Sequence, residues 1–201
     1  MSVAARRSPE ETRSCILACA WDLFRQLGYR TTIADIAGKL GMSSANIYRF
    51  FPSKQSLSEA VCASVLGALV HSMRQAASAE GSASARVRAV LLMLYHGMRD
   101  HMVNEKRVHE VVDIAMAESW SSIDDFIERC AALIGGLVAE GQHAGEFGPG
   151  DPAMLGMLAL QATIIIHHPT MIAQCLGDDP NAEAEAIIAF ALRALTNKTS
   201  P

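Results

Sequence analysis

The sequence is poor in the residue types that build strands. Aromatic residues make up only 5% of the 201 residues, and runs of β-branched residues are scarce. Ala, Leu, Ile and Met are abundant instead, so local propensity favours helix along most of the chain. Charged residues are also few, at 19%, whereas half of all residues are hydrophobic, a balance that excludes a disordered chain. We therefore expect an all-α fold with substantial hydrophobic cores.

An export signal and a disulfide framework are also absent from the sequence. Arg6 and Arg7 are followed by Pro9 and two glutamates, where a secretory signal would need an apolar segment. The cysteines are odd in number, scattered and without a C-x-x-C pair, which indicates reduced thiols packed as small apolar groups: Cys15, Cys19, Cys62, Cys130 and Cys175. These features predict a cytoplasmic protein.

A membrane span is not expected, although residues 152–177 carry no formal charge. The apolar part of this segment ends at Ile166, before His167, His168 and Pro169, and is too short to cross a bilayer comfortably.

Catalytic and metal-binding motifs are missing as well. The chain has no G-x-S-x-G, no P-loop, no G-x-G-x-x-G after a strand and no zinc-protease motif. His167 and His168 are neighbours, but adjacent side chains on a helix diverge by about 100° and chelate poorly. The acidic residues of the central region are spread along several expected helices, which favours a solvated surface over paired-carboxylate chemistry. We expect no enzymatic activity, no cofactor and no metal.

Charge is distributed unevenly along a chain whose net charge is −4. Residues 1–54 contain eight Lys or Arg and four Asp or Glu, whereas residues 55–201 contain nine and seventeen. A basic segment joined to an acidic one is typical of a phosphate-binding module attached to a domain that does not touch nucleic acid. We accordingly place a head at residues 1–54 and a body at residues 55–201.

Three short helices are expected in the head. Ser8 followed by Pro9 and two glutamates predicts a helix start, and Gly28 predicts its end. A two-turn helix follows Thr32 and ends at Gly41, and a third helix begins at Ser43 or Ser44 and ends before Pro52. Two short helices joined by a tight turn containing glycine are typical of a helix-turn-helix.

The segment TTIADIAGKLGMSSANIYRFFPSKQSL, residues 31–57, resembles the DNA-binding segment of the TetR family of transcriptional regulators. Its most specific part runs from Ile47 to Lys54. The resemblance implies a homodimeric repressor with about nine helices, which binds a palindromic operator and is released by a small apolar ligand held in the C-terminal domain.

Specific DNA contacts follow from the same resemblance. It places Ser44, Ala45 and Asn46 at base edges, Tyr48 and Arg49 at phosphates or bases, and Thr32 and Lys54 at phosphates. Ser43, with Ser44 and Ala45, is small enough for the backbone to approach DNA closely. Ala45 stands where the family often has Gly, and Ser44 where it often has a longer polar side chain, so the base preference is not readable from the sequence.

A longer helix is expected from Lys54 to about Ala77, with an apolar stripe of Leu57, Ala60, Val61, Val65, Ala68 and Leu69. Further helices are expected at residues 85–103, 106–118, 121–144, 152–168 and 180–197. The last two are apolar on more than one face, so we expect a two-fold interface formed by residues 152–168 and 180–197. A dimer would present two heads about 34 Å apart, the spacing of palindromic half-sites.

Several polar, aromatic and sulfur-containing residues of the central helices are candidates for lining a ligand cavity: Tyr95, Met98, Met102, His109, Met116, Trp120 and Met157. At helical spacing the same residues can equally be ordinary core. Two other functions also stay open from sequence alone, namely a helical enzyme or carrier that uses its head only for packing, and a nonspecific nucleoid protein.

Overall fold

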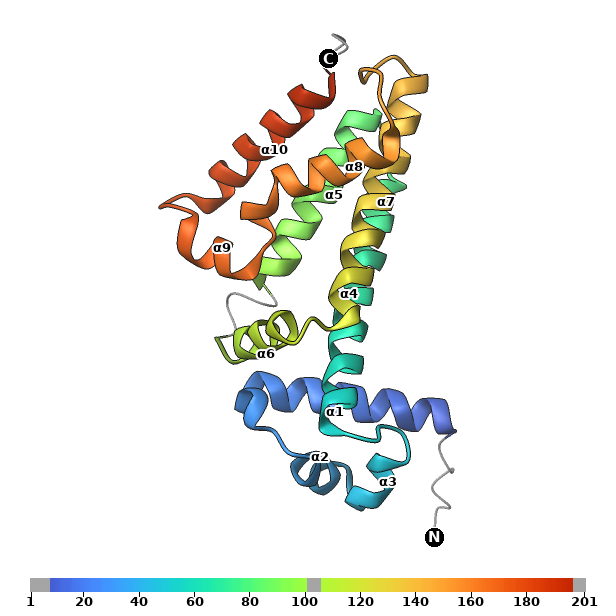
Figure 1. The fold of residues 1–201 in the computed structure, drawn as a ribbon, viewed down its shortest axis with the longest axis vertical. Coiled ribbons are helices and arrows are strands. Elements are labelled where there is room, and N and C mark those ends of the chain that lie inside the picture. Colours follow the sequence, from blue (N-terminus) through green and yellow to red (C-terminus); the bar gives the residue numbers. More distant parts are fainter. Residues whose placement is uncertain (1–7, 101–105, 197–201) are drawn as a thin grey trace.

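The structure is a computed structural model that describes residues 8–100 and 106–196. Within these ranges it contains ten α-helices and no strand, so the all-α prediction is confirmed. Figure 1 shows a small tip at the end of the molecule near the N-terminus and a larger helical body above it. The helices are α1 (Pro9–Leu27), α2 (Ile33–Leu40), α3 (Ser44–Tyr48), α4 (Lys54–Ala77), α5 (Ala83–Met98), α6 (Lys106–Ala117), α7 (Ser121–His143), α8 (Pro152–Ala162), α9 (Pro169–Cys175) and α10 (Pro180–Thr196).

The expected starts of the head helices are confirmed by their caps. Ser8 and Glu11 form a reciprocal capping box at the start of α1, and Thr32 and Asp35 form another at the start of α2. The hydroxyl of Ser43 accepts the Asn46 N–H at 3.2 Å, which identifies Ser43 as the cap of α3. These caps satisfy backbone donors locally, and this is why the sequence alone locates them.

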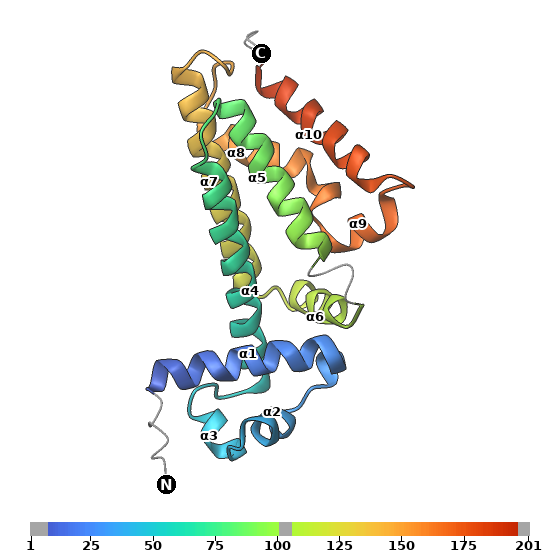
Figure 2. The same cartoon turned by 180° about the vertical axis from the view of Figure 1, so that it is seen from behind.

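Helix α4 connects the head to the body. Its first half packs on α1, and its second half lies against α5 and α7, as Figure 2 shows from behind. The observed helix has the expected bounds, but its buried stripe is shifted: Leu66, Val70 and Met73 are buried, whereas Ala68 is exposed. The helix is apolar on several sides because it packs on different neighbours at its two ends.

The described residues include one helix, α4, that is long and apolar enough to cross a bilayer by composition. A third of its most apolar window is buried, and its neighbours are the protein's own helices. Core helices of soluble proteins pass the same compositional test, so α4 is weak evidence for a membrane span.

The C-terminal region differs from the expected pattern in one place. The helix predicted at 152–168 ends at Ala162, and a 3₁₀ turn, η3 (Ile164–Ile166), follows it. The additional helix α9 then begins at Pro169, whose fixed φ suits the first turn of a helix. The described residues thus form ten α-helices, one more than the approximate count of nine, and His167 and His168 lie in the bend between η3 and α9.

Two hydrophobic cores hold the described chain together. The head core combines α1, α2 and α3 with Leu57 and Val61 of α4 and, from the body, Val111 and Ala115 of α6. The body core is built around α4, α5, α7, α8 and α10. All five cysteines are free thiols, as their odd number predicted. Residues of α4 and α6 beyond position 54 belong to the head core. The predicted boundary between a head at residues 1–54 and a body at residues 55–201 therefore stays a prediction.

Candidate nucleic-acid interface and ligand cavity

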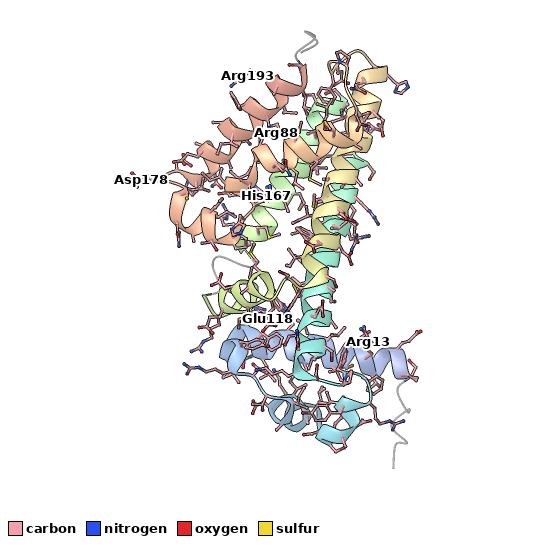
Figure 3. The ribbon with its side chains drawn as sticks, viewed as in Figure 1. Arg13, Arg88, Glu118, His167, Asp178 and Arg193 are labelled. Carbon is pink, nitrogen blue, oxygen red and sulfur yellow. The ribbon has the colours of Figure 1, made fainter. Side chains whose placement is uncertain are left out.

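Helix α3 lies at the tip of the head with one side buried and the other open. Ile47 is fully buried and Phe51 nearly so, as expected for the side that packs on the head core. The guanidinium of Arg13 on α1 lies 5.0 Å from the Phe51 ring centroid and holds this end of α3 against α1. Figure 3 shows Arg13 at this end of the head.

The side chains predicted to contact DNA are mostly on the open side of this tip. Ser43, Ala45 and Arg49 are exposed, and Tyr48 is 48% exposed. Ser44 and Asn46 are half-buried. The exposed side of α3 is therefore made of short polar side chains, one tyrosine and one arginine, and it is of a size that a major groove admits.

Thr32 is exposed at the start of α2, beside the turn that leads to α3. Its hydroxyl donates to a carboxylate oxygen of Asp35 at 2.7 Å and accepts the Asp35 N–H at 3.1 Å. The hydroxyl of Thr32 also holds the pKa of Asp35 below its usual range, with help from the Thr32 backbone N–H. An ionised Asp35 thus keeps the start of α2 fixed.

Lys54 is half-buried and is bonded within the protein. Its ammonium group donates to the backbone carbonyl of Tyr29 and lies 4.0 Å from the centre of the Tyr29 ring. Burial lowers the pKa of this half-buried lysine. Lys54 therefore ties the start of α4 to η1 (Gly28–Arg30), and a phosphate would have to share its ammonium with Tyr29.

A cavity lies in the lower part of the body, between α4, α5, α6, α7 and the η3–α9 bend. Its volume is about 90 Å³, and it is partly open to solvent. The described residues that line it are nearly all apolar: Cys62, Leu66, Met98, Val112, Met116, Ile123, Phe126, Ile127, Ile164, His167, His168 and Pro169.

The structure brings two of the predicted ligand residues, Met98 and Met116, to this cavity. Tyr95 is buried in the body core with its hydroxyl 3.3 Å from Asn181, and Met157 packs against the same core. Trp120 is buried in the head core, where its indole N–H donates to Glu118 at 2.9 Å. Met102 and the side chain of His109 lie outside the described residues.

The bend between η3 and α9 contributes residues that sequence reasoning missed. The Nε2 of His167 lies 2.8 Å from the carbonyl oxygen of Leu160, and because a carbonyl only accepts, Nε2 carries the proton. Burial lowers the pKa of His167, so the ring is neutral near pH 7. The sequence predicted one continuous helix to residue 168, and that prediction did not place His167 and His168 beside α4 and α7.

Helix α6 separates the cavity from the head. Val112 and Met116 line the cavity, whereas Val111 and Ala115, on the next face of the helix, belong to the head core. Helix α6 also contacts α1 and η1, and Figure 3 shows Glu118, just after its end, at the junction of head and body. Helix α6 therefore contributes to both the cavity wall and the head core.

Comparison with known proteins agrees with this architecture. Residues 16–61 match the family model of bacterial regulatory proteins of the tetR family, and residues 83–188, more than half of the chain, match the tetracyclin repressor-like C-terminal domain. An uncharacterized HTH-type transcriptional regulator of Bacillus subtilis, YvaF, is 28% identical over 126 residues, which cover 62% of this chain and 65% of YvaF. The chain thus spans slightly less than two thirds of that relative.

Solved structures share the fold at low sequence identity. A transcriptional regulator from Cytophaga hutchinsonii superposes with a TM-score of 0.72 at 17% identity, covering 92% of this chain and 99% of its own. A TetR-family transcriptional regulator from Pectobacterium atrosepticum gives a TM-score of 0.71 at 22% identity, covering 96% of this chain and all of its own.

A helix-turn-helix tip joined to a helical body defines a class of DNA-binding transcriptional regulators. The chain belongs to the TetR family of transcriptional regulators, and α2 and α3 form its DNA-binding helix-turn-helix.

Proposed function

We infer that the protein is a cytoplasmic, homodimeric repressor that binds a palindromic operator and leaves it when a small apolar molecule occupies the body cavity. The carrying observation is the position of α6, which lines the cavity with Val112 and Met116 and enters the head core with Val111 and Ala115. A molecule in the cavity would therefore contact the same helix that helps to position the head. A difference in affinity between two arrangements, of about 1 to 3 kcal/mol, is enough for regulation.

The homodimer is supported by exposed apolar side chains at the end of the molecule opposite the head. Phe190 on α10 is 66% exposed, and Met154 and Leu158 on α8 are 62% and 50% exposed. Large apolar side chains this exposed are typical of an interface with another protein. Helices α8 and α10 contact each other, so these exposed side chains come from neighbouring helices, and a two-fold partner could cover both.

Selection from a random duplex pool with the full chain tests the DNA-binding part. We expect an inverted repeat whose half-sites lie about one helical turn apart. Asn46→Ala should change the selected bases within each half-site, because an amide pairs with a base edge and alanine does not. Competition by random DNA as effective as that by the selected site would instead indicate a nonspecific nucleoid protein.

Light scattering tests the dimer. The wild-type chain should have twice the 21.6 kDa of one subunit, and Phe190→Glu should shift it toward the monomer and weaken operator binding, since the buried surface would then carry unpaired charge. Met93→Glu, which places the same charge on an exposed methionine of α5 outside the proposed interface, is the matched control. A monomeric wild-type chain at micromolar concentration contradicts the proposal.

A further inference from the structure

The histidines of the cavity wall differ in how their nitrogens are satisfied. His167 is buried, and its Nε2–H donates to the Leu160 carbonyl, so its ring is engaged in holding the η3–α9 bend. The neighbouring His168 also lines the cavity, but its Nδ1 is shielded from solvent and has no hydrogen-bond partner among the described residues. Buried polar atoms are nearly always paired, so this nitrogen calls for an explanation.

The His168 side chain forms no hydrogen bond that would stabilise the start of α9. It occupies the cap position of α9, where a side chain can bond a backbone N–H, yet no side-chain capping bond is formed there. Rotation by half a turn about the Cβ–Cγ bond exchanges Nδ1 with Cδ2 at nearly the same ring position. This rotation therefore decides whether a nitrogen or a carbon occupies the shielded position, while the residue as a whole lines the cavity.

The rest of the described wall restricts the charge of any occupant. It contains no Asp, Glu, Lys or Arg, and the neighbouring His167 is held neutral by burial. A charged occupant would lose its hydration without gaining a charged partner, which is costly in an apolar space. Cys62 also lines the cavity, and burial raises the pKa of its thiol, so it stays protonated and offers no thiolate for covalent capture.

We propose that the cavity binds an uncharged, largely apolar molecule carrying one hydroxyl group, of the phenol or alcohol type, which bonds to the imidazole of His168. A hydroxyl both donates and accepts, so it can pair with an imidazole nitrogen whether or not that nitrogen carries a hydrogen. The apolar part of the molecule would lie against side chains such as Phe126, Ile127 and Met116. This inference rests on the proposed function in one respect, namely that the ligand occupies the body cavity.

The test compares three probes that differ in one substituent: 1-naphthol, 1-methylnaphthalene and 1-naphthoate. Their affinities for the full chain are measured by calorimetry without DNA. Transfer out of water alone favours the methyl group over the hydroxyl, so a preference for 1-naphthol requires a polar partner in the cavity. We expect 1-naphthol to bind about tenfold more tightly than 1-methylnaphthalene and 1-naphthoate to bind most weakly.

Two variants then assign the preference to His168. In His168→Leu the tenfold preference for 1-naphthol should be lost or reversed in favour of 1-methylnaphthalene, and the melting temperature of the unliganded protein should not decrease, because an unpaired buried nitrogen is removed. In Ile127→Ala, which trims the same wall without removing a polar atom, both affinities should fall while their ratio stays.

Several outcomes would overturn the inference. Equal binding of 1-naphthol and 1-methylnaphthalene by the wild-type chain, tightest binding of 1-naphthoate, or no binding of any probe each contradicts it, and none of these needs a variant to fold. An unchanged ratio in His168→Leu also contradicts it. Because these measurements contain no DNA, they are independent of the operator selection and the light scattering that test the proposed function.

Discussion

At the scale of single residues, the two cations predicted to meet DNA in the head occupy different environments. Arg49 follows α3 and is exposed at the tip, free to reach a phosphate or a base. Lys54 is half-buried and bonded to the Tyr29 carbonyl within the protein. Arg49 is thus available for DNA, whereas Lys54 holds α4 against η1. The sequence shows two cations, and only the structure distinguishes these roles.

Replacement of Arg49 by alanine should therefore weaken operator binding and reduce its dependence on salt. Each phosphate contact releases counterions, so losing one contact lowers the slope of log affinity against log salt concentration by about 1. Fluorescence anisotropy with the selected duplex at several salt concentrations measures this slope. Arg74→Ala, at an exposed arginine in the last turn of α4, should leave it unchanged. Equal slopes for wild type and Arg49→Ala would contradict the prediction that Arg49 contacts a phosphate.

At the scale of helices, the sequence predicted what is decided locally. The carboxylate of Asp151 accepts backbone N–H groups at the start of α8, and Asp179 bonds the Ala182 N–H at the start of α10, so each Asp-Pro pair marks a true helix start. The cavity and α9 escaped prediction because they depend on contacts between distant segments. The wall of the cavity, for example, combines residues of α4, α5, α6 and α7 with the η3–α9 bend.

The start of α5 depends on a carboxylate from another part of the chain. Glu146, in the loop after α7, accepts the N–H groups of Ser84 and Ala83 at 3.0 Å each. These two backbone hydrogen bonds, that of Ser84 first, lower the pKa of Glu146 below its usual value. A lowered carboxyl pKa stabilises the fold above its ordinary titration range, and this contribution is lost as pH falls through the lowered value.

Glu146→Gln should accordingly lower the free energy of unfolding at pH 7 by about 0.5 to 1 kcal/mol, the usual effect of a negative charge at a helix N-terminus. The difference from wild type should vanish in acid, where Glu146 is protonated and resembles glutamine. Urea titrations at the two pH values measure it. Glu80→Gln, at an exposed glutamate between α4 and α5, is the control, and a deficit independent of pH would contradict the role of charge.

Helices α7 and α8 pack with their backbones almost in contact. A Cβ placed on Gly156 would lie 2.5 Å from the backbone nitrogen of Gly135 and 2.6 Å from the carbonyl oxygen of Ala131. Gly156→Ala should therefore destabilise the protein by about 3 kcal/mol, because main-chain atoms cannot move aside as a flexible side chain would. The neighbouring Gly136 of α7 is exposed and has nothing within 4 Å of such an atom.

Gly136→Ala is for that reason the matched control, with an expected gain of about 0.5 to 1 kcal/mol from the better helix propensity of alanine. Thermal unfolding followed by circular dichroism gives both changes. Similar stability of the two variants would mean that α7 and α8 are farther apart in solution than in this structure.

At the scale of the whole molecule, the functional surfaces are separated along the long axis. The helix-turn-helix lies at one end, and the exposed apolar residues of α8 and α10 lie toward the other (Figure 1). The cavity is between them, directly above α6. The cavity and the head core share α6, and Cys62 of α4 and Ile123 of α7 also line the cavity and pack against the head core.

Filling the cavity with one of the protein's own side chains should imitate an occupant. Met116 lies on α6, lines the cavity and is 42% exposed. Met116→Trp adds a large apolar ring there, and if an occupied cavity and a DNA-competent head exclude each other, operator affinity should fall by about 5- to 150-fold, the span of ordinary coupling energies. Anisotropy with the selected duplex measures the affinity, and circular dichroism confirms that the helices are retained.

Met93→Trp places the same ring on a similarly exposed methionine of α5 that is not part of this cavity, and it should bind the operator as the wild type does. Equal affinities of the two tryptophan variants would mean that α6 does not transmit the state of the cavity to the head, because the added ring occupies the cavity side of that helix in one variant only.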